Sequence, residues 1–117
     1  MLKIETVIPH IPSTNKSVTA AFFTELFEFK IKSNSEHFTE LKNNQYTIGL
    51  LKTDKLDNEQ SIYMKVSKID ELWTKLKNKI VLLKHRELFT QPYGMKEFHV
   101  IIPETSTLLM VGESTHD

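Results

Sequence analysis

Apolar residues in the last quarter of the chain recur at every second position. They are Phe98, Val100 and Ile102. A second apolar run follows at residues 108–111, after a turn opened by Pro103. Because a period of two places successive side chains on opposite faces of a strand, the pattern predicts a β-hairpin with one apolar face. Its other face is mixed and carries Glu97 and His99.

Two other stretches have apolar residues at the spacing of an α-helix. In residues 16–27 the apolar stripe follows Asn15 and its neighbours, whose side chains suit a helix N-cap. In residues 69–80 the stripe is regular over three turns, and Ser67 begins a sequence that resembles a capping box. The spacing predicts two helices and places Trp73 on the buried stripe of the second one.

Short apolar runs bounded by polar turn residues predict the remaining strands. These runs cover residues 4–11, 29–31, 38–41, 46–51, 61–66 and 80–83. An alternative end of the last predicted strand is residue 89. A polar, turn-rich segment at residues 52–60 separates two halves that have the same order of strand, helix and three strands. We expect one domain over residues 1–117, of the α+β class, made of two βαβββ repeats at about 1–54 and 58–117. A helix on one side of each sheet would leave the other side free to face a ligand.

Charge and composition narrow the choice of partner. Fifteen basic residues are matched by fifteen acidic ones, so no long-range field attracts nucleic acid or an anionic membrane. The absence of cysteine excludes disulfides and thiolate chemistry and suits a reducing compartment. The sequence shows no signal peptide and no uninterrupted apolar run of membrane-spanning length. These features favour a cytoplasmic protein whose partner is a small molecule or another protein.

Residues 7–26, 66–73 and 91–98 form a pattern that spans most of the chain. Together they resemble the vicinal oxygen chelate superfamily, and within it the bleomycin-resistance-like proteins. The most specific segment, 91–98, reads Gln-Pro-Tyr-Gly-Met-Lys-Glu-Phe, where the family typically has Gln-Pro-Trp/Tyr-Gly-Met-Arg-Glu-Phe. The resemblance implies a pair of βαβββ modules, usually in a homodimer whose concave sheets form two clefts.

Metal-using members of this superfamily carry His, Gln or Glu at facing strand positions, because divalent cations need converging oxygen or imidazole donors. The resemblance places Ile8, Ser61 and Met110 at these positions, and none of the three is a usual ligand. It therefore implies a protein with no resident metal and no other cofactor. The alternative is an unconventional divalent site around His10 and His99.

The expected ligand-binding residues come from two arguments. Alternation along residues 61–66 directs Tyr63 and Lys65 away from the helix, and the same parity assigns His10 to the corresponding face of the first repeat. The resemblance aligns Phe38 with an aromatic residue of the drug pocket. The full expected set is Phe38, Tyr63, Lys65, Glu97, His99 and His10.

Each of these assignments has a structural alternative. Tyr63 and Lys65 also fit an ordinary solvated strand face, and Phe38 also fits a strand core. Histidines at such positions are commonly exposed or hydrogen-bonded rather than bound to a ligand. Glu97 and His99, two positions apart on one face, also have the residue types of an acid–base pair.

Three hypotheses about function follow. The first is a metal-independent binding protein that sequesters a small, partly aromatic, antibiotic-like molecule in a homodimer, as the resemblance implies. Family members that capture cationic bleomycin are typically acidic, whereas this chain is neutral and has Lys65 where those binders have a stacking aromatic, so the identity of the drug stays open. The second hypothesis is a metal-dependent glyoxalase-like lyase or isomerase, or a dioxygenase. The third is an interaction module that receives a protein segment.

Overall fold

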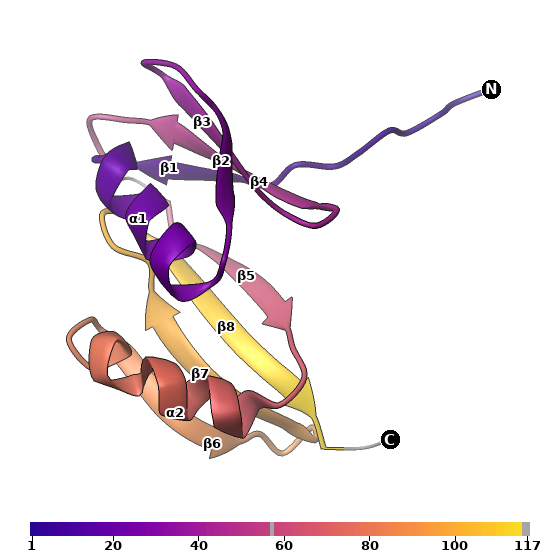
Figure 1. Cartoon of the computed structure of the whole chain (residues 1–117), viewed down its shortest axis with the longest axis vertical. Coiled ribbons are helices and arrows are strands. Elements are labelled where there is room, and N and C mark those ends of the chain that lie inside the picture. The colour runs from indigo at the N-terminus through magenta and orange to yellow at the C-terminus, as the bar shows by residue number, and fades with distance from the viewer. Residues whose placement is uncertain (57, 116–117) are drawn as a thin grey trace. The chain divides into compact units, whose positions relative to one another are not determined.

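The computed structural model describes residues 1–56 and 58–115, which form two modules of the same order (Figure 1). The first module contains β1 (His10–Ser13), α1 (Lys16–Leu26), β2 (Lys30–Asn34), β3 (Phe38–Asn43) and β4 (Tyr46–Lys52). The second contains β5 (Gln60–Lys65), α2 (Ile69–Ile80), β6 (His85–Thr90), β7 (Met95–Ile101) and β8 (Thr107–Ser114). The prediction of an α+β fold made of two βαβββ modules is confirmed. Neither helix in the described ranges is long and apolar enough to cross a membrane.

Each module has its own four-stranded sheet, and the two sheets have equivalent topology. The strand order is β1-β4-β3-β2 in the first sheet and β5-β8-β7-β6 in the second. In both sheets the first strand of the module pairs in parallel with the last, and the other neighbours pair antiparallel. The repeated pairing makes the last two strands of each module the centre of its sheet.

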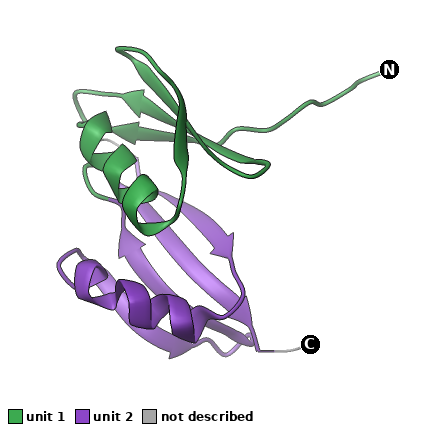
Figure 2. Cartoon of the chain, viewed as in Figure 1, with its two compact units in different colours: residues 1–57, 103–105 green, residues 58–102, 106–117 purple. Residues whose placement is uncertain are grey.

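The chain divides into two compact units that correspond to these modules (Figure 2). Unit 1 comprises Met1–Asp57 together with Pro103–Thr105, and unit 2 comprises the rest. The short turn after β7 belongs to unit 1 because the Thr14 backbone N–H donates to the Glu104 carbonyl at 3.0 Å. The division lies in the predicted connection at residues 52–60, of which residue 57 is outside the described residues.

Unit 1 packs one face of its sheet against α1. The buried side chains of this core include Ile11, Phe22, Phe23, Leu26, Leu41 and Leu50. Asn15 caps the helix, since its side-chain Oδ1 accepts a hydrogen bond from the Val18 backbone N–H at 3.3 Å. Strand alternation then directs the other side chains to the opposite sheet face. We call the sheet face opposite a module's own helix the far face of that module.

Unit 2 packs its sheet against α2 in the same way. The fully buried apolar residues of its strands are Phe98, Val100, Leu109 and Val111. Trp73 of α2 is half-buried and contacts Phe98, with ring centroids 5.1 Å apart, so it packs against the sheet as the helical spacing predicted. Because Phe98 faces the helix, Glu97 and His99 lie on the far face, as the alternation predicted.

Two predicted strands were misplaced. The first begins at His10 rather than at residue 4, and residues 1–9 have no regular structure. The pairing with β4 begins at His10, opposite Gly49. The Pro9 carbonyl still accepts from the Gly49 N–H at 2.9 Å, but Pro9 has no N–H to donate to a ladder. The apolar run at 80–83 is not a strand either, because Ile80 ends α2 and β6 begins only at His85. A short apolar run fits the end of a buried helix as well as it fits a strand.

The N-terminus of α2 is capped from a distant strand rather than by Ser67. The carboxylate of Glu113, in β8, accepts hydrogen bonds from the backbone N–H groups of Lys68 at 2.8 Å and Ile69 at 3.1 Å. Lys68, the N-cap residue, is left-handed with φ 58° and has no side-chain cap of its own. An anionic acceptor at this position also interacts favourably with the helix dipole. Glu113 therefore holds α2 to its sheet.

We predict that Glu113→Ala lowers the free energy of unfolding by about 1 kcal/mol, because two N–H groups of α2 lose their acceptor. Glu113→Gln keeps an acceptor oxygen and should lose less. Urea denaturation followed by circular dichroism measures both effects. Glu25→Ala removes an exposed carboxylate from α1 and serves as the control. Equal losses in Glu25→Ala and Glu113→Ala would contradict the capping role.

Candidate functional site

Glu97 is fully buried although it lies on the far face of unit 2. Its Oε2 accepts hydrogen bonds from the phenols of Tyr63 at 2.7 Å and Tyr93 at 2.5 Å. Its Oε1 accepts from His99 Nε2 at 2.8 Å and Gln91 Nε2 at 3.3 Å. We call these five residues the Glu97 cluster. Four donors therefore occupy both oxygens of the carboxylate.

The electrostatics of the cluster follow from these contacts. Burial on its own would raise the pKa of Glu97, but hydrogen bonds from Tyr63, Tyr93, His99 and Gln91 outweigh it and lower that pKa to about 2. Burial and the hydrogen bond to Glu97 raise the pKa of the Tyr63 phenol. The hydrogen bond to Glu97, with a smaller effect of burial, raises the pKa of Tyr93. The cluster is thus one ionised carboxylate whose two oxygens accept from two phenols, an amide and an imidazole N–H.

A glycine makes room for this arrangement. Gly112 in β8 lies opposite both Lys65 in β5 and Glu97 in β7. A Cβ atom at Gly112 would lie 1.9 Å from the Tyr63 hydroxyl oxygen and 3.0 Å from Glu97 Cγ. The Tyr63 side chain thus reaches across the central strand to Glu97 through space that any other residue would fill.

The turn between β6 and β7 supplies the other two donors. Gly94 has φ 87°, a conformation that favours glycine, and its N–H donates to the Gln91 carbonyl at 3.0 Å. The Gln91 N–H in turn donates to the carbonyl of Met95 at 2.7 Å. This tight turn returns Gln91 and Tyr93 to the start of β7, where Glu97 lies. The motif at residues 91–98 is therefore the local framework of the cluster.

In unit 1, the rings of Phe38 and His10 meet edge to face on the far face, with centroids 5.2 Å apart. They come from β3 and β1, which flank β4, and Gly49 of β4 lies beneath the contact. A Cβ atom at Gly49 would lie 2.6 Å from Phe38 and 3.0 Å from His10. Phe38 is half-buried and His10 is exposed.

The structure brings the expected residues together in two groups and leaves one apart. Tyr63, Glu97 and His99 join in unit 2, and the pair of rings just described forms in unit 1. Lys65 is exposed at the end of β5 and donates no hydrogen bond to the Glu97 cluster. Gln91 and Tyr93 were not assigned a role from sequence, although both belong to the motif. The motif could have identified both residues from the sequence, because its turn positions their side chains beside Glu97.

The positions that the resemblance aligned with metal ligands have other surroundings. Met110 lies in the centre of the second sheet and pairs with Tyr63 on one side and His99 on the other. Ile8 is half-buried, and Ser61 is exposed in β5. Among residues 1–56 and 58–115, no three His, Asp or Glu side chains are grouped as metal ligands would be.

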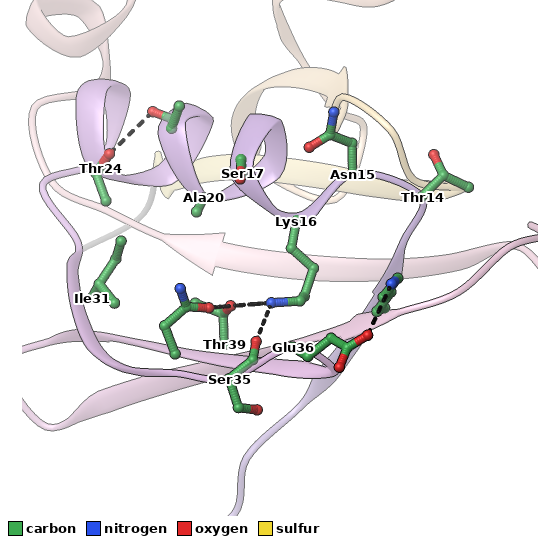
Figure 3. A pocket seen from close by; sticks show the side chains of 13 residues that line it. Thr14, Asn15, Lys16, Ser17, Ala20, Thr24, Ile31, Ser35, Glu36 and Thr39 are labelled. Atoms are coloured by element: carbon green, nitrogen blue, oxygen red, sulfur yellow. Dashed lines mark hydrogen bonds and ion pairs between the residues drawn. The ribbon is translucent and has the colours of Figure 1, made fainter.

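Unit 1 also contains a pocket of about 540 Å³ between α1 and the β2–β3 hairpin (Figure 3). Lys16 extends into it from the first turn of α1. Its ammonium donates to the Ser35 carbonyl and to Thr39 Oγ1, both at 2.8 Å, and to Asn34 Oδ1 at 3.2 Å. All three N–H bonds of the ammonium are used in tying the helix to the sheet. Among the described residues, none of those expected to bind the ligand lines this pocket.

Comparison with known proteins gives similarity of structure rather than of sequence. No protein-family model and no curated protein matches the sequence. A bleomycin-binding protein crystallised with bleomycin is 19% identical, with a TM-score of 0.80, and the alignment covers 95% of this chain and 99% of that one. A bleomycin-binding protein from Streptomyces verticillus in complex with copper(II)-bleomycin is 14% identical, with a TM-score of 0.77 and coverage of 97% and 99%. Lactoylglutathione lyase from Agrobacterium tumefaciens is 11% identical, with a TM-score of 0.75 and coverage of 96% of both chains.

These likenesses show that the chain has the fold of the bleomycin-resistance proteins and of other vicinal oxygen chelate proteins. The resemblance stated from the sequence is thereby confirmed at the level of the fold.

The lowered pKa of Glu97 predicts a specific loss of stability in acid. Its carboxylate stabilises the fold fully above its ordinary pKa of 4.5, and this contribution, about 3 kcal/mol, is lost as the pH falls toward 2. The difference in unfolding free energy between wild type and Glu97→Gln should therefore shrink between about pH 5 and about pH 3. Urea denaturation across this range measures it. Glu25→Gln, at an exposed site, is the control, and a constant difference for Glu97→Gln would refute the prediction.

The role of Gly112 can be tested with a double-mutant cycle. Gly112→Ala should cost about 2 kcal/mol, because its new methyl group displaces the Tyr63 hydroxyl from Glu97. In a Tyr63→Ala background the ring is gone, and the same substitution should cost at least about 1 kcal/mol less. Thermal or urea unfolding of the four proteins gives the coupling energy. Strict additivity would show that the two residues do not compete for this space.

Proposed function

We propose that this chain binds a small, partly aromatic molecule on the far face of unit 2 and acts by capturing it. The observation that carries the proposal is the Glu97 cluster. A buried carboxylate holds the phenol rings of Tyr63 and Tyr93 and the imidazole of His99 in fixed positions. Rings fixed before binding lose little conformational freedom when a flat ligand stacks on them. Tyr63 is 39% exposed and Tyr93 59% exposed, so both retain ring surface for contact.

The same geometry favours binding over acid–base catalysis. A general base or acid works best when its pKa lies near the working pH. The pKa of Glu97 is about 2, and both of its oxygens already accept hydrogen bonds. We therefore assign Glu97 and His99 a positioning role and infer that no chemical step is needed for function.

The structural neighbours support the class of ligand. Two of the three proteins compared above are bleomycin-binding proteins, which supports an antibiotic-like ligand for this chain. We propose metal-independent sequestration, since the positions aligned with metal ligands carry Ile8, Ser61 and Met110. We also propose a homodimer, as the resemblance implies. The zero net charge does not favour a strongly cationic drug, so the proposal concerns the class and not bleomycin itself.

Isothermal titration calorimetry with bleomycin and a panel of flat aromatic compounds tests the proposal. We expect at least one compound to bind with a micromolar or lower Kd, and Tyr63→Ala to weaken it roughly tenfold through loss of stacking. Tyr46→Ala is the matched control, because Tyr46 is a 63% exposed tyrosine in unit 1. If nothing binds more tightly than millimolar, or if both variants lose affinity equally, the proposal fails.

The second candidate is a metal-dependent lyase, isomerase or dioxygenase. The likeness to lactoylglutathione lyase favours it. Elemental analysis of protein purified without chelator separates the two candidates. A stoichiometric content of nickel, zinc, iron or manganese would favour the enzyme over the binding protein. Sedimentation of the same sample tests for the homodimer.

A further inference from the structure

Strand β6 contains an irregularity that shapes the far face of unit 2. Arg86 pairs with His99, and Phe89 pairs with Glu97, so three steps along β6 match two steps along β7. In a regular strand, residues three positions apart point to opposite faces. The shift in register between Arg86 and Phe89 cancels this difference, as a β-bulge does. Both side chains therefore lie on the same face as Glu97 and His99.

The two side chains made neighbours by this shift are in contact. The guanidinium carbon of Arg86 lies 3.5 Å from the centroid of the Phe89 ring. The Phe89 ring meets the His99 ring edge to face, with centroids 5.1 Å apart. The cation–π contact restrains the guanidinium plane while its N–H edge stays free to donate. Arg86 is exposed, and within the described residues no carboxylate forms an ion pair with it.

The charged side chains that strand pairing leaves accessible on this face are positive. The Glu97 carboxylate is buried, and its oxygens are taken by four donors. Of the residues that strand pairing assigns to this face, the accessible charged ones are Arg86 on the edge strand β6 and Lys65 on the opposite edge strand β5. Glu87, beside Arg86 in the shifted stretch of β6, is exposed and is not paired with a residue of β7. An anionic group on the ligand is therefore attracted to this face and a cationic group is repelled.

The pairing of the strands places the aromatic and charged parts in one line. Tyr63 pairs with Met110, Met110 with His99, and His99 with Arg86. This row crosses all four strands from β5 to β6. It presents a phenol, a thioether and an imidazole, and it ends in a guanidinium. Thioether and aromatic groups suit a planar ring, and a guanidinium edge matches a carboxylate in a bidentate contact.

We propose that Arg86, seated on Phe89, is the specificity-determining residue of this face, and that the ligand is a planar aromatic molecule bearing a carboxylate. Its ring lies over the row of Tyr63, Met110 and His99, and its carboxylate accepts hydrogen bonds from Arg86. This inference rests on the proposed ligand-binding function and adds the charge of the ligand to it.

A matched pair of probes tests the inference: 2-naphthoic acid and its neutral counterpart 2-naphthamide, titrated calorimetrically into the full chain. Wild type should bind the acid at least about tenfold more tightly than the amide, as charge-assisted bidentate hydrogen bonds allow. Arg86→Gln should weaken binding of the acid much more than binding of the amide, so that the preference is lost. Arg86→Lys keeps the charge but lacks the planar fork, so part of the preference should remain.

Lys84→Gln is the matched control, because it removes an exposed cation two residues from Arg86 and just outside β6. It should leave the preference for the acid intact. An equal loss in Lys84→Gln and Arg86→Gln would overturn the inference, since it would reveal only a general charge effect. Binding of both probes through Tyr63 without preference would also overturn it while leaving the proposed function standing. Failure of every flat compound to bind would remove the proposed function as well.

Discussion

Burying a single ionised carboxylate is the constraint on which the second module depends. A charge removed from water costs several kcal/mol unless hydrogen bonds and charges around it compensate. In this chain four side chains converge on Glu97 and keep its pKa near 2, so the ionised form is stable inside the protein. The identities of the four donors are thereby coupled, because the loss of one leaves the carboxylate underpaired. Gly112 in β8 follows from the same constraint, because a side chain at this position would occupy the space through which Tyr63 reaches the carboxylate.

The two modules share a framework but differ in what they build on it. Each has the same strand order, and in each an aromatic ring on the far face crosses a central strand at a glycine, Phe38 at Gly49 and Tyr63 at Gly112. In unit 1 the ring meets a histidine in an edge-to-face contact of modest energy. In unit 2 the phenol of Tyr63 donates a hydrogen bond to a buried anion, a stronger and more directional contact. The repeated strand order explains why the Phe38–His10 pair and the Glu97 cluster lie at equivalent places in the two modules. The residue types at each place explain why their chemistry differs.

Sequence periodicity predicted those parts that regular strands and helices determine. Alternation assigned Glu97 and His99 to one face and Phe98 to the other, and helical spacing located α2 through Ile80. Periodicity failed where the backbone departs from regularity. The turn that returns Tyr93 depends on a glycine with positive φ, and the face of Phe89 depends on a register shift in β6. The cap of α2 escaped prediction for another reason, because its acceptor is 45 residues away in the chain.

The motif at residues 91–98 shapes the surface of unit 2, whereas residues outside the motif decide which ligands that surface prefers. Its glycine makes the turn, its glutamine and tyrosine donate, and its glutamate accepts, so these polar groups are used on one another. A motif whose hydrogen bonds are satisfied internally shapes a surface but has little capacity left to distinguish ligands. Discrimination must then come from side chains outside the motif that keep free donors or charge. On this face those are Arg86 and Lys65, which border the aromatic row on the two edge strands. Proteins with the same fold and a similar motif can therefore bind ligands of different charge.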